Sequence, residues 1–156
     1  MSWKVFALLF GALSILAPRP SNAASAWDKP DCFDAEVNAG IAQQTPTAVL
    51  GCGSNCIVMS WPWILKLHVE RVIKGTLPSK ATPLTVLTVQ HAYYRTDLPP
   101  RRWWLRRNSL GVFNVIKIEN GPPLPLCPGG SKPAKPYISL PTGKTLADVE
   151  REAEHP

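Results

Sequence analysis

Residues 63–75, with the sequence WILKLHVERVIKG, constrain the fold more than any other stretch of the chain. Polar and apolar side chains alternate along this stretch, as they do in a half-buried β-strand. The apolar face carries Trp63, Leu65, Leu67 and Val69. The alternation fails at Arg71, which takes an apolar position, so we expect a β-bulge or a sharp bend near residues 70–71. A long strand with such a bend can turn the corner of a barrel or take part in two sheets.

Residues 1–23 have the pattern of a cleavable signal peptide. A lysine precedes an apolar run over residues 5–17, which is shorter than the roughly 20 residues that a membrane-spanning helix needs. Small residues lead up to Ala23, so we expect cleavage after Ala23, with Ala26 as the second choice. The mature chain, residues 24–156, would then be one small domain, exported to the bacterial periplasm or secreted, with no membrane span.

Positive charge is concentrated in the middle of the chain. Losing Lys4 and Arg19 with the signal peptide would leave 15 of the 17 Lys and Arg residues against 11 Asp and Glu residues, a net charge of +4. Residues 60–135 hold 12 of these basic residues and 3 acidic ones, a local excess of +9. This distribution predicts one positive face, suited to a partner with negative charge, rather than a uniformly basic protein.

The four cysteines predict two disulfides in an exported chain: Cys32, Cys52, Cys56 and Cys127. Three pairings are possible, and we favour Cys52–Cys56, which closes a short loop, with Cys32–Cys127, which ties the ends of the domain together. A zinc site built from Cys52 and Cys56 with His68 and His91 is the alternative, but structural zinc sites have more closely spaced ligands. We therefore expect neither a metal nor another cofactor.

Two short helices are expected near the ends of the mature chain. Phe33, Val37 and Ile41 lie four residues apart, which predicts a helix from Cys32 to about Gln43. A capping box at Thr145–Asp148 predicts a second helix, which ends at about Glu154.

Three further strands are predicted over residues 84–91, 102–107 and 112–118, and the last two form a hairpin. Asn108 and Gly111 occupy positions of a type I turn that suit both residues. Six prolines make residues 121–136 an irregular segment, which Cys127 would hold in place. Together these elements predict a mostly β domain, a small five-stranded OB-like barrel with short N- and C-terminal helices.

Several of these features resemble bacterial members of the netrin-module and metalloproteinase-inhibitor-like barrel superfamily. They are the strand end at residues 69–75, the apolar strand after it, the hairpin with Trp103, and Cys127. The resemblance covers roughly residues 56–127 and implies an extracytoplasmic binding barrel tied by disulfides. Metalloproteinase inhibitors of that superfamily chelate the zinc of the protease through an N-terminal cysteine. Cys32 lies several residues inside the mature chain, so this inhibitory mechanism is not carried over.

The segment Arg101–Arg107, RRWWLRR, is the sharpest functional signal in the chain. On a strand, Trp103 and Leu105 would face the core, and Trp104 would lie on the other face between Arg102 and Arg106. A ring between two guanidinium groups is a cation–π arrangement. Arginine forks bind phosphate and carboxylate groups, and aromatic rings stack on flat ligand rings.

We therefore predict a contact surface for an anionic ligand, with Lys66 and His68 as possible neighbours of the hairpin. Its residues are Arg101, Arg102, Trp104, Arg106 and Arg107. The alternative is a solvated strand whose charges keep a sheet edge from pairing with other chains. Among the other tryptophans, Trp63 is expected in the core and Trp61 on the rim, where it could belong to an aromatic platform for sugars or a partner protein.

These patterns favour an exported, monomeric, non-catalytic binding module. Its partner would be an anionic glycan, a lipid head group or an envelope protein, and export argues against nucleic acid. Two alternatives stay open. One is a protease inhibitor that acts through the rigid segment 121–136. The other is a small envelope hydrolase that uses His68 or His91, for which the sequence does not show a nucleophile or carboxylate converging on either histidine.

Overall fold

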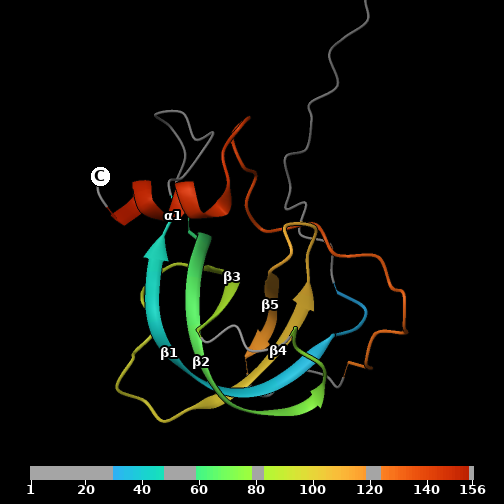
Figure 1. The fold of residues 1–156 in the computed structure, drawn as a ribbon. Helices are drawn as coiled ribbons and strands as arrows, with labels where there is room; N and C mark the ends of the chain where they lie inside the picture. Colours follow the sequence, from blue (N-terminus) through green and yellow to red (C-terminus); the bar gives the residue numbers. More distant parts are fainter. Residues whose placement is uncertain (1–29, 48–58, 79–82, 119–123, 155–156) are drawn as a thin grey trace, which may run out of the picture.

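Five strands curl into a closed barrel and one helix lies beside it in the computed structural model of the chain (Figure 1). The structure describes residues 30–47, 59–78, 83–118 and 124–154. Their elements are β1 (Ala35–Pro46), β2 (Trp61–Gly75), β3 (Leu84–Gln90), β4 (Arg101–Arg107), β5 (Phe113–Ile118) and α1 (Leu146–Glu154). The predicted signal peptide and the predicted Cys52–Cys56 disulfide lie outside the described residues.

The strands are ordered β1-β2-β3-β5-β4 around the barrel, and β4 pairs with β1 to close it. All pairs are antiparallel except β3 with β5, which run parallel. The prediction of a mostly β, five-stranded barrel is confirmed. Because β4 pairs with β1 on one side and β5 on the other, it is not a sheet edge, and its arginines are not needed there to block edge pairing.

The predicted bulge in β2 is confirmed. In the ladder with β1, Asn38 lies opposite Arg71 and Ala39 lies opposite Val69, so Glu70 is an extra residue on β2. The Nδ2 atom of Asn38 donates a hydrogen bond to the displaced Glu70 carboxylate at 3.0 Å. The bulge lets β2 pair with β3 near its start and continue along β1 to its end, as a bent barrel strand must.

The helix predicted from Cys32 to about Gln43 is wrong, because residues 35–46 form β1. A spacing of four residues is also a multiple of two, so the apolar positions 33, 37 and 41 fit a strand as well as a helix. Ala35 and Ala39 complete the alternation, and both are fully buried. Pairing with both β2 and β4 then outweighs the local preference of the alanines for helix.

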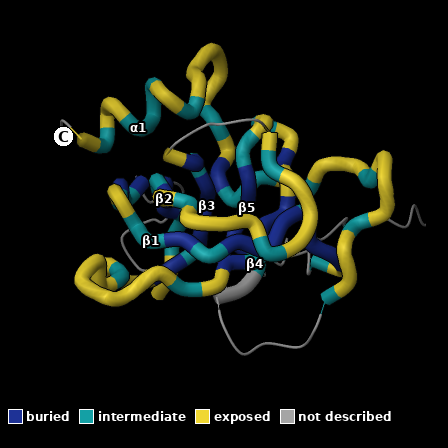
Figure 2. The backbone as a smooth tube through the Cα atoms, turned by 60° about the horizontal axis from the view of Figure 1, so that its bottom comes forward, coloured by how far each residue is buried: buried dark blue, intermediate teal, exposed yellow. Residues whose placement is uncertain are grey.

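The barrel interior is filled by large apolar side chains. Figure 2 colours the backbone by burial, and the buried residues lie along the strands. They include Val37, Trp63, Leu65, Leu67, Val86, Trp103, Leu105 and Phe113. The two buried indoles keep their hydrogen bonds: Trp63 Nε1 donates to the Gln90 carbonyl at 3.1 Å, and Trp103 Nε1 donates to the Ala39 carbonyl at 2.9 Å. The predicted inward positions of Trp63 and Trp103 are therefore confirmed.

A disulfide joins Cys32 to Cys127, as predicted, and links positions 95 residues apart. Disulfides persist mainly in oxidising compartments. Beyond Cys127 the proline-rich segment follows the hairpin instead of forming a strand of its own. The Ala134 amide donates to the Arg107 carbonyl at 2.9 Å. The buried Asn114 donates to the Lys135 carbonyl at 2.7 Å.

The predicted C-terminal helix and its cap are confirmed as α1. The Thr145 amide donates to the Asp148 carboxylate at 2.9 Å, and the Asp148 amide donates to the Thr145 hydroxyl at 3.2 Å. The apolar side of α1 packs on a small cluster outside the barrel, which contains Ile64, Leu87 and Ile138. Among the described residues no helix is long and apolar enough to cross a membrane.

Candidate functional site

The four arginines of β4 occupy different environments, although the sequence places them in one short run. Arg106 is buried. Its Nη1 atom lies 2.8 Å from the Asp34 carboxylate, and its Nη2 atom donates to the Lys132 carbonyl at 2.6 Å. A guanidinium held in this way joins β4, the start of β1 and the proline-rich segment. It is a structural group rather than one presented to a ligand.

Arg102 lies on the outer face of the barrel, as predicted, and is 57% exposed. Its Nη1 atom lies 3.4 Å from the carboxylate of Glu36, which is only 5% exposed. Trp104 shares this outer face and is partly buried. The buried carboxylate offsets the charge of Arg102, so this part of the predicted contact surface is less positive than its sequence indicates.

Arg101 belongs to the other end of β4. Its guanidinium carbon lies 4.8 Å from the ring centre of Tyr94 and 5.0 Å from that of Trp103. These are cation–π distances, but the rings are not the one predicted from the sequence. The predicted surface is therefore divided between the two ends of β4 and its outer face.

The two predicted neighbours of the hairpin lie elsewhere on the barrel. Lys66 is held by α1 and β3, because its Nζ atom lies 2.8 Å from the Glu150 carboxylate of α1 and 3.2 Å from the Thr85 hydroxyl of β3. His68 is exposed on β2, opposite Gly40 of β1. His91 is exposed in the loop that follows β3. Within the described ranges, no group of three or more His, Cys, Asp and Glu side chains is arranged to hold a metal ion.

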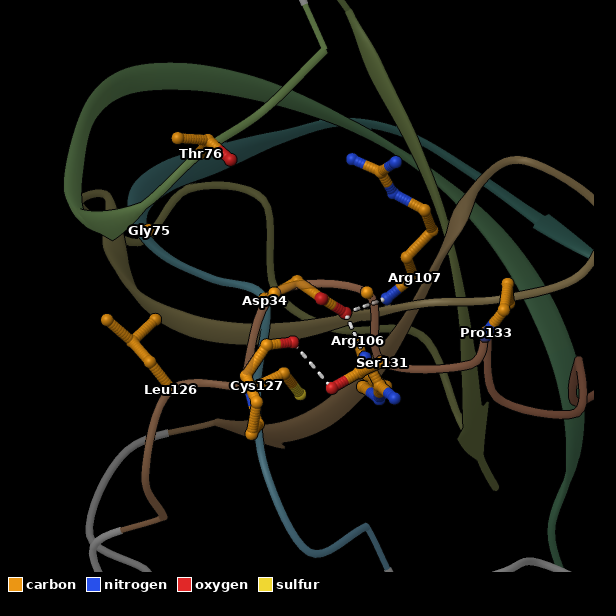
Figure 3. Close-up of a pocket in the computed structure, with 12 residues that line it drawn as sticks. Asp34, Gly75, Thr76, Arg106, Arg107, Leu126, Cys127, Ser131 and Pro133 are labelled. Atoms are coloured by element: carbon orange, nitrogen blue, oxygen red, sulfur yellow. Dashed lines mark hydrogen bonds and ion pairs between the residues drawn. The ribbon is translucent and has the colours of Figure 1, made fainter.

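A pocket of about 360 Å³ opens where the start of β1, the ends of β2 and β4, and the proline-rich segment meet (Figure 3). We name it the disulfide pocket. Its lining residues are Asp34, Gly75, Thr76, Arg106, Arg107, Leu126, Cys127, Pro128, Gly129, Gly130, Ser131 and Pro133. The Cys32–Cys127 bond holds residues 126–133 against the barrel, and this produces the pocket.

The rim of the disulfide pocket depends on a close approach between β2 and the start of β1. Gly75 has a φ of 75°, and a Cβ atom on it would lie 2.0 Å from the Asp34 carbonyl oxygen. The Thr76 amide donates to that same oxygen at 3.3 Å. Only glycine fits this position. The backbone conformation of Gly75 places the next residue, Thr76, at the pocket rim.

Arg107 determines the charge of the disulfide pocket. The Asp34 carboxylate accepts hydrogen bonds from the Arg106 guanidinium at 2.8 Å and from the Arg107 backbone amide at 2.6 Å, so its charge is balanced. The Arg107 side chain is exposed and points away from Asp34 (Figure 3). In the described part of the chain it forms no ion pair, and its nearest ring contact is Phe113, at 5.9 Å.

Sequence analysis missed three polar residues of this pocket: Asp34, Thr76 and Ser131. Asp34 comes together with Arg106 across 72 positions of the chain, a distance that no local pattern reveals. The predicted Cys32–Cys127 bond was the available signal, because it brings residues near Cys127 to the start of β1.

The chain matches no family model, no curated protein and no solved structure. The resemblance to the netrin-module and metalloproteinase-inhibitor-like superfamily is not tested by these comparisons and stays a prediction.

Proposed function

We propose that this protein is an exported, non-catalytic binding module that holds an anionic group of its ligand through Arg107 at the disulfide pocket. The observation that carries the proposal is an exposed guanidinium, without an ion pair in the described residues, at a pocket of about 360 Å³. Mouths of barrels are common ligand sites. A guanidinium fork matches the geometry of phosphate and carboxylate groups.

The size and lining of the pocket suggest the class of ligand. Ligand pockets span about 300–1,000 Å³, so this one is suited to a single charged group rather than a whole polymer. The hydroxyl of Thr76 on the rim could add a neutral hydrogen bond to the charge of Arg107. The ligand group would be a phosphate or carboxylate carried by a glycan or a lipid head group.

Export rests on the signal-peptide pattern of residues 1–23 and is supported by the Cys32–Cys127 disulfide. The strand order β1-β2-β3-β5-β4 supports placing the barrel in the OB-like class, whose members bind oligonucleotides and oligosaccharides. Of these two ligand classes, an exported protein is more consistent with a glycan.

Arg102 provides a matched control for Arg107, because both are exposed arginines of the same strand. Of the two guanidinium groups, only that of Arg102 lies within ion-pair distance of a carboxylate among the described residues, that of Glu36. Arg107→Ser should weaken binding about tenfold or more to vesicles with phosphatidylglycerol or to polygalacturonate, because a charge-assisted hydrogen bond is lost. The remaining binding should depend less on salt. Arg102→Ser should have little effect. The two probes distinguish a lipid phosphate from a glycan carboxylate as the source of the anion.

Binding would be measured by co-sedimentation with the vesicles and by calorimetry with the polymer, at low and physiological salt. Equal losses in the two variants would indicate a general positive face rather than a site at Arg107. Undiminished binding by Arg107→Ser would refute the proposal.

A further inference from the structure

A second polar region lies at the other end of β4, around the loop of residues 91–100. Arg101 begins β4 and Arg107 ends it, so the two regions are roughly 20 Å apart along the strand. Figure 1 shows the loop at the lower left of the barrel and residues 124–136 at its right. We name this region the tyrosine end. Its residues are Trp61, Gln90, Tyr93, Tyr94 and Arg101.

Paired hydrogen bonds hold Tyr94 at this end of the barrel. The Tyr94 amide donates to Gln44 Oε1 at 2.8 Å, and Gln44 Nε2 donates to the Tyr94 carbonyl at 2.8 Å. These bonds fix which atom of the Gln44 amide is the oxygen. The amide of Gln90 is fixed in turn, because its Nε2 atom donates to Gln44 Oε1 at 3.4 Å and to the Ala92 carbonyl at 3.0 Å.

This arrangement leaves two buried polar atoms without a hydrogen-bond partner in the described part of the chain. One is the acceptor Oε1 of Gln90, a residue that is only 5% exposed. The other is the donor Nη2 of Arg101, whose guanidinium lies against the rings of Tyr94 and Trp103. Buried polar atoms are nearly always paired, so each of these indicates a partner that the described residues do not supply.

Two further aromatic rings, those of Trp61 and Tyr93, lie near Gln90, the strand partner of Trp61. Trp61 is stacked on Trp63, with ring centres 5.6 Å apart and an interplanar angle of 29°. Tyr93 is 64% exposed and meets Trp63 edge-on at 4.6 Å. The indole of Trp63 also donates to the Gln90 carbonyl at 3.1 Å. Trp63 therefore contacts Gln90 as well as the rings of Trp61 and Tyr93.

The two unpaired atoms restrict the kind of ligand. An anion would satisfy Arg101 but would repel the oxygen of Gln90, whereas a cation would do the reverse. A hydroxyl group both donates and accepts, so a compound with several hydroxyls can satisfy both residues. Aromatic rings pack against the C–H faces of sugar rings. We propose that the tyrosine end binds a neutral saccharide, which stacks on Tyr93 and Trp61 and bonds Gln90 and Arg101 through its hydroxyls.

Both polar atoms are buried, so a sugar reaches them only when the loop of residues 91–100 moves outward. Two attachments hold Tyr94 in the closed position: its hydrogen bonds to Gln44 and its ring contact with Arg101. The site is separate from the disulfide pocket and does not depend on the function proposed for Arg107.

Saturation-transfer NMR on the purified protein tests this inference with the neutral tetrasaccharides chitotetraose, cellotetraose, maltotetraose and mannotetraose. Tetragalacturonate serves as the anionic counterpart. We expect transfer to the ring protons of at least one neutral tetrasaccharide. Tyr93→Ala, a change at an exposed side chain that should preserve the fold, should abolish the transfer. Gln90→Met, which is similar in size but lacks the acceptor, should weaken binding at least tenfold.

Arg107→Ser is the matched control and should leave saccharide binding unchanged. If no neutral tetrasaccharide receives saturation transfer from the protein, the two polar atoms form hydrogen bonds with water alone and the proposal is wrong. It is also wrong if transfer persists in Tyr93→Ala or if only tetragalacturonate binds. Because Arg107→Ser and Tyr93→Ala act at opposite ends of β4, each of the two proposed sites can be refuted without affecting the other.

Discussion

At the scale of single residues, Gly75 connects the barrel to the disulfide pocket. Its left-handed backbone allows the end of β2 to pass close to Asp34, where a side chain would collide with a backbone carbonyl. Gly111 has a similar φ, 79°, in the hairpin turn, but a Cβ atom there would meet nothing within 4 Å. An alanine at Gly75 would therefore suffer both backbone strain and steric collision, whereas an alanine at Gly111 would suffer backbone strain alone.

Gly75→Ala is expected to lower the free energy of unfolding by at least about 2 kcal/mol, because strain and collision act together. Gly111→Ala should cost only about 1 kcal/mol, from strain alone. Urea unfolding followed by tryptophan fluorescence measures both variants. Similar losses in the two would contradict the close approach of Gly75 to Asp34.

Arg106 and Arg107 show what residue-level sequence analysis could not provide. They are neighbours of the same type, yet one is buried against Asp34 and the other is exposed at the pocket. The alternation along β4 correctly predicted that Trp103 and Leu105 point inward. It could not identify Arg106 as structural, because that role depends on a carboxylate far away in the sequence.

At the scale of elements, α1 is fixed to the barrel by its cap and by apolar contacts. Hydrogen bonds from the Thr145 side chain and backbone hold the pKa of Asp148 below its ordinary value, and nearby Arg151 lowers it further. Because the folded-state pKa is depressed, the cap stabilises α1 above the ordinary pKa of an aspartate. That stabilisation is lost as pH falls through the folded-state value.

Acidification should therefore loosen the first turn of α1, and the effect should be smaller in Asp148→Asn, which keeps a hydrogen-bond acceptor but does not titrate. The amide NMR signals of residues 145–150 report the change between pH 6 and pH 2. The ion pair of α1 between Glu150 and Lys66 is common to both proteins. The comparison between the two proteins isolates Asp148, and identical acid transitions would contradict the role of the cap.

The elements that the sequence predicted well are those with a local signature. β2 follows from its alternation and its break near Arg71, the hairpin turn follows from Asn108 and Gly111, and α1 follows from its capping box. β1 was missed because its apolar spacing fits two periodicities, and pairing with strands distant in sequence decides between them.

At the scale of the whole molecule, the order of the strands and the disulfide pocket arise from contacts between distant segments. The sequence supported a five-stranded barrel and the Cys32–Cys127 pairing, but not the parallel contact of β3 with β5. The disulfide joins positions 95 residues apart and brings the proline-rich segment over one end of the barrel. The disulfide pocket is lined by this segment together with residues of β2, β4 and the start of β1. No single stretch of the sequence could therefore predict its lining.

The anion site at Arg107 is tested by a ¹H–¹⁵N NMR titration of the oxidised protein with inorganic pyrophosphate, in which each backbone amide reports its own surroundings. If Arg107 holds the anion, we expect saturable shifts confined to residues lining the disulfide pocket, led by Thr76, Arg107, Gly129 and Gly130. These shifts should disappear in Arg107→Ser. Shifts centred on Arg102 and Trp104, or no saturable shifts at all, would contradict an anion site at Arg107.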